Sequence, residues 1–468
     1  MEQDKKRPDH LSEEILIWRE KSHLARTLLK GTAGMKEAAN DYLPQHTVES
    51  DKSYARRLSL STLLNIYKKT SSFLTGKVFQ KDIVFADDVP ESAIEWSKAI
   101  NSKGDSLGLF AQTNFFNGIS KGASFVFIDM PKKPGNVKSK KDEKAAGLRP
   151  YFKEIKWKDI RGGVVDDKGK LIQVRFAETA MVPDGEYSNI VKNRIRVVEI
   201  GKWKLLELDE RTKEFKEIES GENELTVLNF IAFIPDEELG PLTGIPPMND
   251  LGELNLKHWR SSSVRDNYLS VARIPVYLAL KIDLEKAPMG VANMFGSDED
   301  GADMKVVEHS GQAIGAGAND LKAIENNMAL DGLQQLVPRA GNQTATEKSL
   351  NNSDSNSNLG TWATEYEAFM IKAFKIAAMF MKQEFPDNGL TVNKSFNLGV
   401  YDINELNFLI SSKDGDRPVL SPKAVFDELV RKGAISDKID FEDVKAEIEQ
   451  DKRTASEFMA LAGAIGSA

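Results

Sequence analysis

The sequence has no cysteine in its 468 residues. Disulfide bonds, cysteine-ligated zinc, iron–sulfur clusters and thiol nucleophiles are therefore excluded, and the composition fits folding in a reducing compartment. Long apolar runs are also absent: the longest stretch, 225–235, is broken by Thr226 and Asn229 and falls short of the roughly 20 apolar residues that a membrane span needs. The charged segment 1–10 has no apolar signal core. We therefore expect neither secretion nor a membrane partner.

Basic residues are outnumbered by acidic ones. Lys and Arg total 63 and Asp and Glu total 71, which gives a formal net charge of −8. A protein that clamps duplex DNA usually presents a basic face, because its affinity comes from displacing counterions from the phosphates. The acidic balance therefore argues against a simple DNA clamp. With 41% hydrophobic and 29% charged residues, the chain belongs to the globular class and is long enough for two or three domains.

Motifs of common enzymes are absent as well. None of the five histidines lies at metal-ligand spacing from another, and neither a Walker A sequence nor a G-x-S-x-G nucleophile elbow occurs. The carboxylate clusters Asp166-Asp167 and Asp298-Glu299-Asp300 could bind Mg²⁺, but two-metal sites need carboxylates that converge from several elements, so acids in surface turns are the simpler interpretation. We therefore predict that the chain is not an enzyme and holds no metal and no cofactor.

Hydrophobic periodicity divides the first half of the chain into a helical part and a β-rich part. Apolar residues at helical spacing predict helices over 11–30 and 51–76, and two shorter helices precede a compact strand at 123–128. From 150 to 235 the period changes to two, with polar turns such as Asp167-Lys168-Gly169, which predicts an antiparallel β region. The sequence therefore predicts an α+β fold.

A pair of long helices around a small insertion follows. Capping residues and periodicity predict a helix over 249–272 and a second over 319–336, and two short strands, 276–281 and 304–308, in the segment between them. Two helices that flank a compact insertion predict a stalk with a tip.

A polar run and the most regular helix come next. Asn and Ser dominate 338–360, which favours a loop because such a run buries no core. The helix predicted over 361–384 carries an apolar stripe, which could pack on a neighbouring subunit or in the core of the chain itself. The members of the stripe are Trp362, Tyr366, Phe369, Ala373, Ile376 and Phe380. Capped helices that begin at Ser421 and Asp440 complete the chain.

Several short motifs follow one another in a distinctive order between about residues 40 and 450. They are Tyr42-Leu43-Pro44, Glu49-Ser50-Asp51, YARRL at 54–58, Arg149-Pro150-Tyr151, IAFIP at 231–235, Pro246-Pro247, DLGELNLKHWR at 250–260 and TATE at 344–347. In this order they resemble the portal proteins of tailed phages, in particular a family of portals with an uncharacterised domain. The Asn- and Ser-rich run 351–358 is longer and more polar than the family pattern.

The resemblance implies a portal-type fold with a β-rich wing, two long stem helices, a small α/β clip and a helical crown. In chain order the implied segments are the wing at 1–248, stem helix 1 at 249–272, the clip at 273–318, stem helix 2 at 319–336, a tunnel-loop region at 337–360, a long helix with a wing return at 361–420 and the crown at 421–468.

The resemblance also implies a function. A portal is a homo-oligomeric ring, usually a dodecamer, at one capsid vertex of the virion, and it is assembled in the host cytoplasm. Double-stranded DNA passes through it during packaging and ejection. It docks the terminase large subunit and head-completion or adaptor proteins, and it contacts capsid and scaffolding proteins. Two other functions stay open: a metal-dependent nucleic-acid-processing enzyme that uses the acidic clusters, and a non-ring capsid or neck adaptor.

Candidate site residues follow from these implied roles. Neutral residues suit a channel in which DNA slides, because each neutralised phosphate adds affinity through counterion release. The DNA-channel candidates are Arg339, Asn342, Lys348, Asn351 and Asn352. The clip candidates for partner docking are Asp283, Glu285, Lys286, Asp298 and Glu299. A cyclic ring needs two different adhesive faces on each subunit. The subunit-packing candidates are Trp259, Trp362, Phe369 and Phe380.

Overall fold

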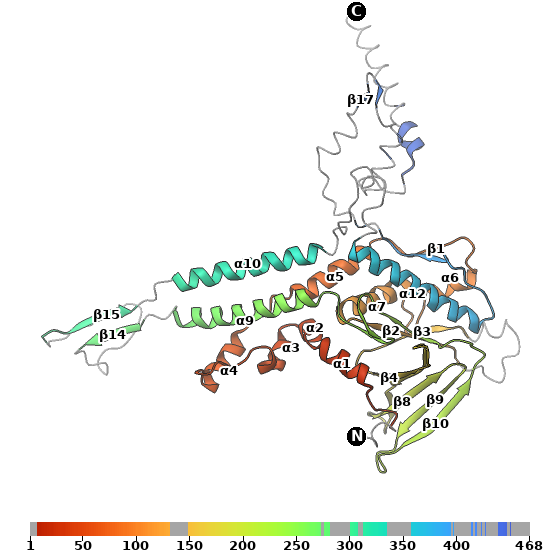
Figure 1. Ribbon diagram of the computed structural model, residues 1–468, viewed down its shortest axis with the longest axis horizontal. Helices are drawn as coiled ribbons and strands as arrows, with labels where there is room; N and C mark the ends of the chain where they lie inside the picture. Colours follow the sequence, from red (N-terminus) through yellow and green to blue (C-terminus); the bar gives the residue numbers. More distant parts are fainter. Residues whose placement is uncertain are drawn as a thin grey trace, which may run out of the picture. The chain divides into compact units, whose positions relative to one another are not determined.

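The chain divides into two compact units, Met1–Lys394 and Ser395–Ala468, and each is described by itself. The computed structural model (Figure 1) describes residues 7–131, 148–272, 276–280, 300–307, 312–334, 357–394, 396 and 439–446, with a few further residues between 413 and 450. Helices and antiparallel strands both occur in unit 1, so the predicted α+β class is confirmed.

Short helices replace the two long ones that the sequence predicts near the N-terminus. The predicted helix over 51–76 is wrong in its middle, because Asn65 caps a new helix by accepting a hydrogen bond from the Lys68 amide at 3.0 Å. The predicted helix over 11–30 is interrupted at Ser22, whose hydroxyl donates to the Trp18 carbonyl at 2.6 Å. The elements are α1 Glu13–Lys21, α2 His23–Leu29, α3 Gly31–Ala38, the 3-10 turn η2 Ala39–Asp41, α4 Asp51–Leu60 and α5 Ile66–Val78.

Two antiparallel sheets form the β-rich part of unit 1, as the period of two predicts. The three-stranded sheet has the order β11-β2-β3, with β2 Ser124–Asp129, β3 Tyr151–Ile155 and β11 Phe230–Phe233. The five-stranded sheet has the order β10-β9-β8-β5-β4, with β4 Ile160–Val165, β5 Leu171–Ala177, β8 Arg194–Glu199, β9 Lys202–Leu208 and β10 Phe215–Glu222. Two separate hairpins are β6 Ala180–Pro183 with β7 Asn189–Lys192, and β12 Glu238–Gly240 with β13 Thr243–Gly244.

Aromatic side chains from both sheets share one core. The Phe176 and Phe230 rings stack with centroids 5.8 Å apart, and Trp18 of α1 meets Phe125 edge-on at 5.6 Å. The Trp18 indole also donates to the Lys121 carbonyl at 2.9 Å. This core therefore joins α1 to the sheets.

A second aromatic core lies around α12, Asn358–Phe380. The helix begins before its predicted start at 361, because the Ser357 hydroxyl accepts a hydrogen bond from the Gly360 amide at 3.1 Å. Its stripe packs inward on the strands β2 and β11 of unit 1. The smaller elements nearby are α6 Glu91–Ser97, α7 Leu107–Lys121 and the strand pair β1 Val84–Phe85 with β16 Leu390–Thr391.

Gly122 ends α7 where two backbones come close together. Its φ is +85°, a conformation that favours glycine, and a Cβ there would lie 2.0 Å from the Gly244 carbonyl oxygen. The turn that leads from α7 into β2 therefore requires glycine.

In unit 2 the described residues include β17 Lys413–Asp414, β18 Arg417–Pro418 and the helical stretch 441–446. Asp440 starts this stretch as predicted: its side chain accepts from the Glu442 amide at 2.7 Å. The helix predicted to begin at Ser421 falls almost wholly outside the described residues. A search of the described helices finds none that is long and apolar enough to cross a membrane.

Candidate functional site

The two long helices predicted after residue 248 lie side by side in unit 1 (Figure 1). Helix α9 spans Asn249–Ala272, the predicted bounds. Helix α10 spans Gln312–Gln334 and begins before the predicted start at 319. Gly315 and Gly317 lie in its first turns, so this segment is helical despite the low helix propensity of glycine.

A two-stranded tip connects the helices. Strands β14 Val276–Leu280 and β15 Asp303–Val307 pair antiparallel, with Val276 opposite Val307 and Leu280 opposite Asp303. Figure 1 shows both strands beyond the ends of α9 and α10. The predicted strands are thus confirmed to within one or two residues.

A line of apolar side chains holds α10 in place. Leu321, Ile324 and Met328 recur at steps of three and four, and each is at most 2% exposed. On α9, Trp259 is completely buried. His258 Nε2 lies 3.1 Å from Glu325 Oε1, so a polar contact also bridges the two helices.

Asn255 fixes the base of α9 to the body. Its side-chain oxygen accepts from the Tyr67 amide at 3.0 Å, and its side-chain nitrogen donates to the Leu64 carbonyl at 2.9 Å. The Tyr67 amide lies in the first turn of α5, where it lacks a helical partner, and the Leu64 carbonyl just before the helix also accepts from the Ile66 amide at 2.9 Å. Asn255 is fully buried. Asn255 lies in the motif at 250–260, but this role could not be predicted from the sequence, because its partners are almost 200 residues away along the chain.

A second clamp involves three of the N-terminal motifs that resemble portal proteins. The Arg57 guanidinium donates to both carboxylate oxygens of Glu49, at 2.9 and 2.7 Å, and to the Pro44 carbonyl at 2.9 Å. The Arg57 and Glu49 side chains are 2% and 7% exposed. Helix α4 packs against α9, and Arg260 of α9 donates to the Tyr42 carbonyl at 2.9 Å. These motif residues therefore support the helix pair.

A groove of about 430 Å³ lies further out between the two helices. Arg260, Val264 and Tyr268 line it from α9, and Gly317 and Asp320 line it from α10. Because Gly317 has no side chain and Val264 is 47% exposed, the groove has an open apolar floor with charged residues at its rim. It is suited to packing contacts rather than to chemistry.

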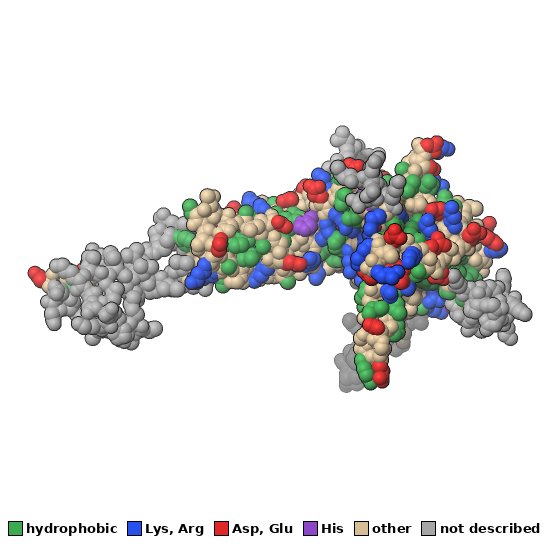
Figure 2. Space-filling model, turned by 90° about the horizontal axis from the view of Figure 1, so that it is seen from below, with side chains coloured by type: hydrophobic (Ala, Val, Ile, Leu, Met, Phe, Trp, Pro, Cys, Tyr) green, Lys and Arg blue, Asp and Glu red, His purple; other side chains and the backbone are tan. Residues whose placement is uncertain are grey.

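Charge is distributed unevenly over unit 1. Figure 2 shows Lys and Arg side chains gathered over the body on the face that it draws.

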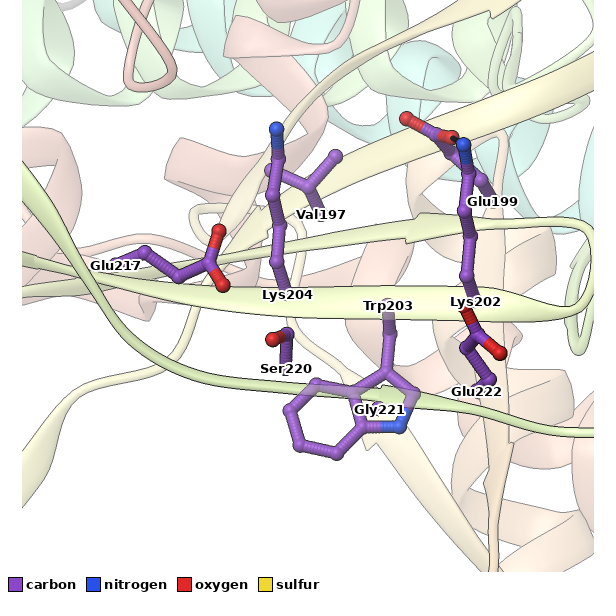
Figure 3. A pocket seen from close by; sticks show the side chains of 9 residues that line it. All are labelled: Val197, Glu199, Lys202, Trp203, Lys204, Glu217, Ser220, Gly221 and Glu222. Atoms are coloured by element: carbon purple, nitrogen blue, oxygen red, sulfur yellow. Dashed lines mark ion pairs between the residues drawn. The ribbon is translucent and has the colours of Figure 1, made fainter.

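The five-stranded sheet carries a shallow cavity of about 320 Å³ (Figure 3). Lys202 lies in a row with Glu199 and Glu222 of the neighbouring strands, and its amine is 2.9 Å from Glu199. The hydrogen bond from Lys202 lowers the pKa of Glu199. On the opposite side of the strands, Trp203 covers Gly221. The charged side chains that line this cavity lie opposite one another on adjacent strands at the surface of the sheet. This arrangement offers no activated nucleophile.

Asp166 has a local structural role. Its carboxylate accepts hydrogen bonds from the Lys168 and Lys170 amides at 3.0 and 2.8 Å, which closes the β4–β5 turn. Within the ranges that the structure describes, no group of three or more His, Asp or Glu side chains is arranged to hold a metal ion.

The predicted site residues fall into two groups. Trp259, Trp362 and Phe369 are buried in the core of unit 1, and Phe380 is half-buried. The sequence left two roles open for Trp362 and Phe369, packing in the core of the chain or packing on a neighbouring subunit. The structure shows both side chains in the core. The channel candidates Arg339, Asn342, Lys348, Asn351 and Asn352 and the clip candidates Asp283, Glu285, Lys286, Asp298 and Glu299 lie outside the described residues.

Glu365 on α12 gives a pH-dependent prediction. Although Glu365 is an exposed residue, partial desolvation of its carboxyl and then the charges of Asp236 and Glu238 raise its pKa from 4.5 to about 7. The Glu365 carboxyl therefore loses its proton at a lower pH in the unfolded chain than in the folded chain. The free energy of unfolding consequently falls as the pH rises from about 4.5 through 7. We expect Glu365→Gln to unfold at a higher temperature than wild type at pH 8 and at the same temperature at pH 4. Equal shifts at both pH values, measured by thermal denaturation, would contradict this origin.

One known domain family matches part of this chain. Residues 247–381, which include α9, α10 and α12, match the family model described as "Domain of unknown function (DUF4055)". A search of curated proteins gives no significant match.

Three solved structures have similar chains, all from gene transfer agent (GTA) particles. The virion of the native particle contains a chain with 10% identity and a TM-score of 0.41, which covers 88% of this chain and 98% of that one. A chain in the neck of the empty particle, computed with C6 symmetry, has 12% identity and a TM-score of 0.42, and the match covers 89% of this chain and 93% of that one. A chain in the neck of the native particle, computed with C12 symmetry, has 10% identity and a TM-score of 0.41, and the match covers 85% of this chain and 98% of that one. At these scores the likeness carries no conclusion about function.

Proposed function

We propose that this chain is a portal protein, which forms a ring at one capsid vertex and serves as the conduit for DNA packaging and ejection. The observation that carries the proposal is the pair α9 and α10 with its β14–β15 tip, anchored to an α+β body by buried polar contacts. Such a pair repeated around an axis would enclose a channel. The order of sequence motifs that resembles tailed-phage portals supports the same function.

The segments receive roles within this proposal. Helices α9 and α10 are the stem, the segment with β14 and β15 is the clip, and the sheets with the N-terminal helices are the wing. The residues from 337 to about 360 are the tunnel loop, and 421–468 is the crown. Double-stranded DNA occupies the channel, while the terminase large subunit and head-completion proteins bind the clip. The ring is a dodecamer in the capsid of the virion.

Electron microscopy of the purified protein tests the proposal directly. We expect rings with a central hole wide enough for duplex DNA in negative stain, and a particle mass that is a multiple of 52.0 kDa in light scattering. A strictly monomeric protein at every salt concentration would refute the ring. Compact oligomers without a channel would instead favour a neck adaptor.

A nuclease assay examines the enzymatic alternative. Mg²⁺-dependent cleavage of DNA that is lost in the double variant Asp166→Asn with Asp167→Asn would overturn a purely structural role. Because Asp166 closes a turn, circular dichroism must show that the variant is folded.

A further inference from the structure

Among the strands that the structure describes, β6 and β7 pair only with each other. An isolated two-stranded hairpin is marginally stable in water. Met181 and Val191 lie directly opposite one another and are 77% and 54% exposed. An exposed apolar pair on a hairpin that no third described strand joins is suited to packing on another molecule.

The loop of this hairpin is acidic and aromatic. Asp184 and Glu186 have no ion-pair partner among the residues that the structure describes. Tyr187 is 91% exposed, and its hydroxyl donates to the Glu186 carboxylate at 2.7 Å. The hairpin thus presents two carboxylates and one ring to solvent.

A cluster of positively charged side chains, opposite in charge to the hairpin loop, lies where α1, α2 and α7 meet the end of β3. The Arg26 guanidinium carbon is 4.1 Å from the centre of the Trp157 ring, and that of Arg19 is 5.7 Å away. We call this set the basic cleft. Its cations are Arg19, Arg26, Lys121, Lys156, Lys158 and Arg161.

The basic cleft has an excess of positive charge, which the nearby carboxylates of Glu154, Asp159 and Asp9 offset only in part. Across the described ranges, none of its six cations has an ion-pair partner within 4.0 Å. Burial and then the charge of Arg19 lower the pKa of Arg26 to about 10. Burial also lowers the pKa of Lys121, although Glu154 nearby raises it. Half-buried like charges repel one another, and an anion that enters the cleft would relieve this repulsion.

The cleft also has room for a side chain. A cavity of about 280 Å³ is lined by Lys121, Lys156, Trp157 and Lys158 and by the carboxylate residue Glu154, with Phe125 and Ile155 supplying apolar surface. Its lining therefore combines apolar surface with three lysines and one glutamate. The hairpin loop has the matching combination, an aromatic ring beside two carboxylates.

We propose that the basic cleft of one subunit binds the β6–β7 hairpin of a second copy of this chain. The inference rests on the proposed ring and adds the contact that closes it. A cyclic ring needs a heterologous interface with two different, complementary patches on each subunit, and the hairpin and the cleft are such a pair. The charge complementarity fixes the orientation of neighbours, and the apolar residues Met181 and Val191 are covered on docking.

Engineered cysteines test the contact cleanly, because the chain has none of its own. The variant Ser188→Cys carries a thiol in the hairpin loop, and Lys156→Cys carries one at the cleft rim. We expect oxidised mixtures of the two single variants to give covalent dimers, and the variant with both cysteines to give a ladder beyond the dimer. Crosslinks confined to one chain, or no crosslinks, would overturn the proposal.

A charge exchange provides the second test. We expect Asp184→Lys with Glu186→Lys, and separately Lys156→Glu with Lys158→Glu, to lose rings by sedimentation velocity, and the combined variant to recover them. Lys168→Glu with Lys170→Glu, two exposed lysines in another turn, is the matched control and should assemble normally.

Failure of this contact is distinguishable from failure of the portal proposal. Wild-type protein without rings would refute the portal itself. Rings that survive both charge reversals, without crosslinks, would refute only the hairpin contact. Loss of binding to a short DNA duplex in Lys156→Glu with Lys158→Glu, while its rings persist, would instead assign the cleft to nucleic acid.

Discussion

Replacing Tyr366 with alanine is expected to lower the free energy of unfolding by about 3–5 kcal/mol. Tyr366 is completely buried, and its ring centroid lies 4.9 Å from that of Phe233 and 5.2 Å from that of Phe115. Its hydroxyl donates to the Ala111 carbonyl of α7 at 3.0 Å. The side chain therefore links α12 to α7 and β11, and its removal leaves a cavity that the aromatic rings around it fill only in part.

Chemical denaturation followed by circular dichroism measures this loss. The matched control is Tyr366→Phe, which keeps the ring and removes only the hydrogen bond, so we expect it to cost about 1 kcal/mol. Equal costs for the two variants would show that the hydrogen bond, and not packing, holds α12. Because α12 lies in the body, we expect Tyr366→Ala to weaken ring assembly through folding rather than through the subunit contact.

Arg57→Ala is the second change with a large expected effect, also about 3–5 kcal/mol of unfolding free energy. It removes the partner of a carboxylate that is only 7% exposed and leaves the Pro44 carbonyl without its donor. Replacing both partners, as in Glu49→Gln with Arg57→Met, removes the buried charges together. We therefore expect the double variant to be more stable than Arg57→Ala.

The pH dependence of this pair separates charge from packing. The hydrogen bond from Arg57 lowers the pKa of Glu49 below its usual 4.5. The pair therefore stabilises the fold above about pH 4.5, and this contribution is lost as the pH falls through the lowered pKa. The stability gap between wild type and Arg57→Ala should narrow at acidic pH. A gap that stays constant, measured by denaturation across this range, would assign the effect to packing alone.

Some elements could be predicted from local sequence alone. The bounds of α9 follow from Pro246-Pro247 before it and Pro275 after it, because proline and capping residues act locally. The β-rich part was also predictable, because a period of two places apolar residues on one face of each strand. The start of α10 was not, because the glycines at 315 and 317 argue locally against a helix there.

The sequence by itself determined the class of fold, the helix–tip–helix order after residue 248 and the absence of cysteine chemistry, because each depends on composition or on neighbours within a few residues. Only the tertiary structure decided that the α12 stripe is core, that Asn255 and Arg57 hold the stem helix, and that a basic cleft exists. Arg26, Lys121 and Lys158 are separated by dozens of residues in the chain. Their shared site depends on long-range packing, and no local pattern encodes it.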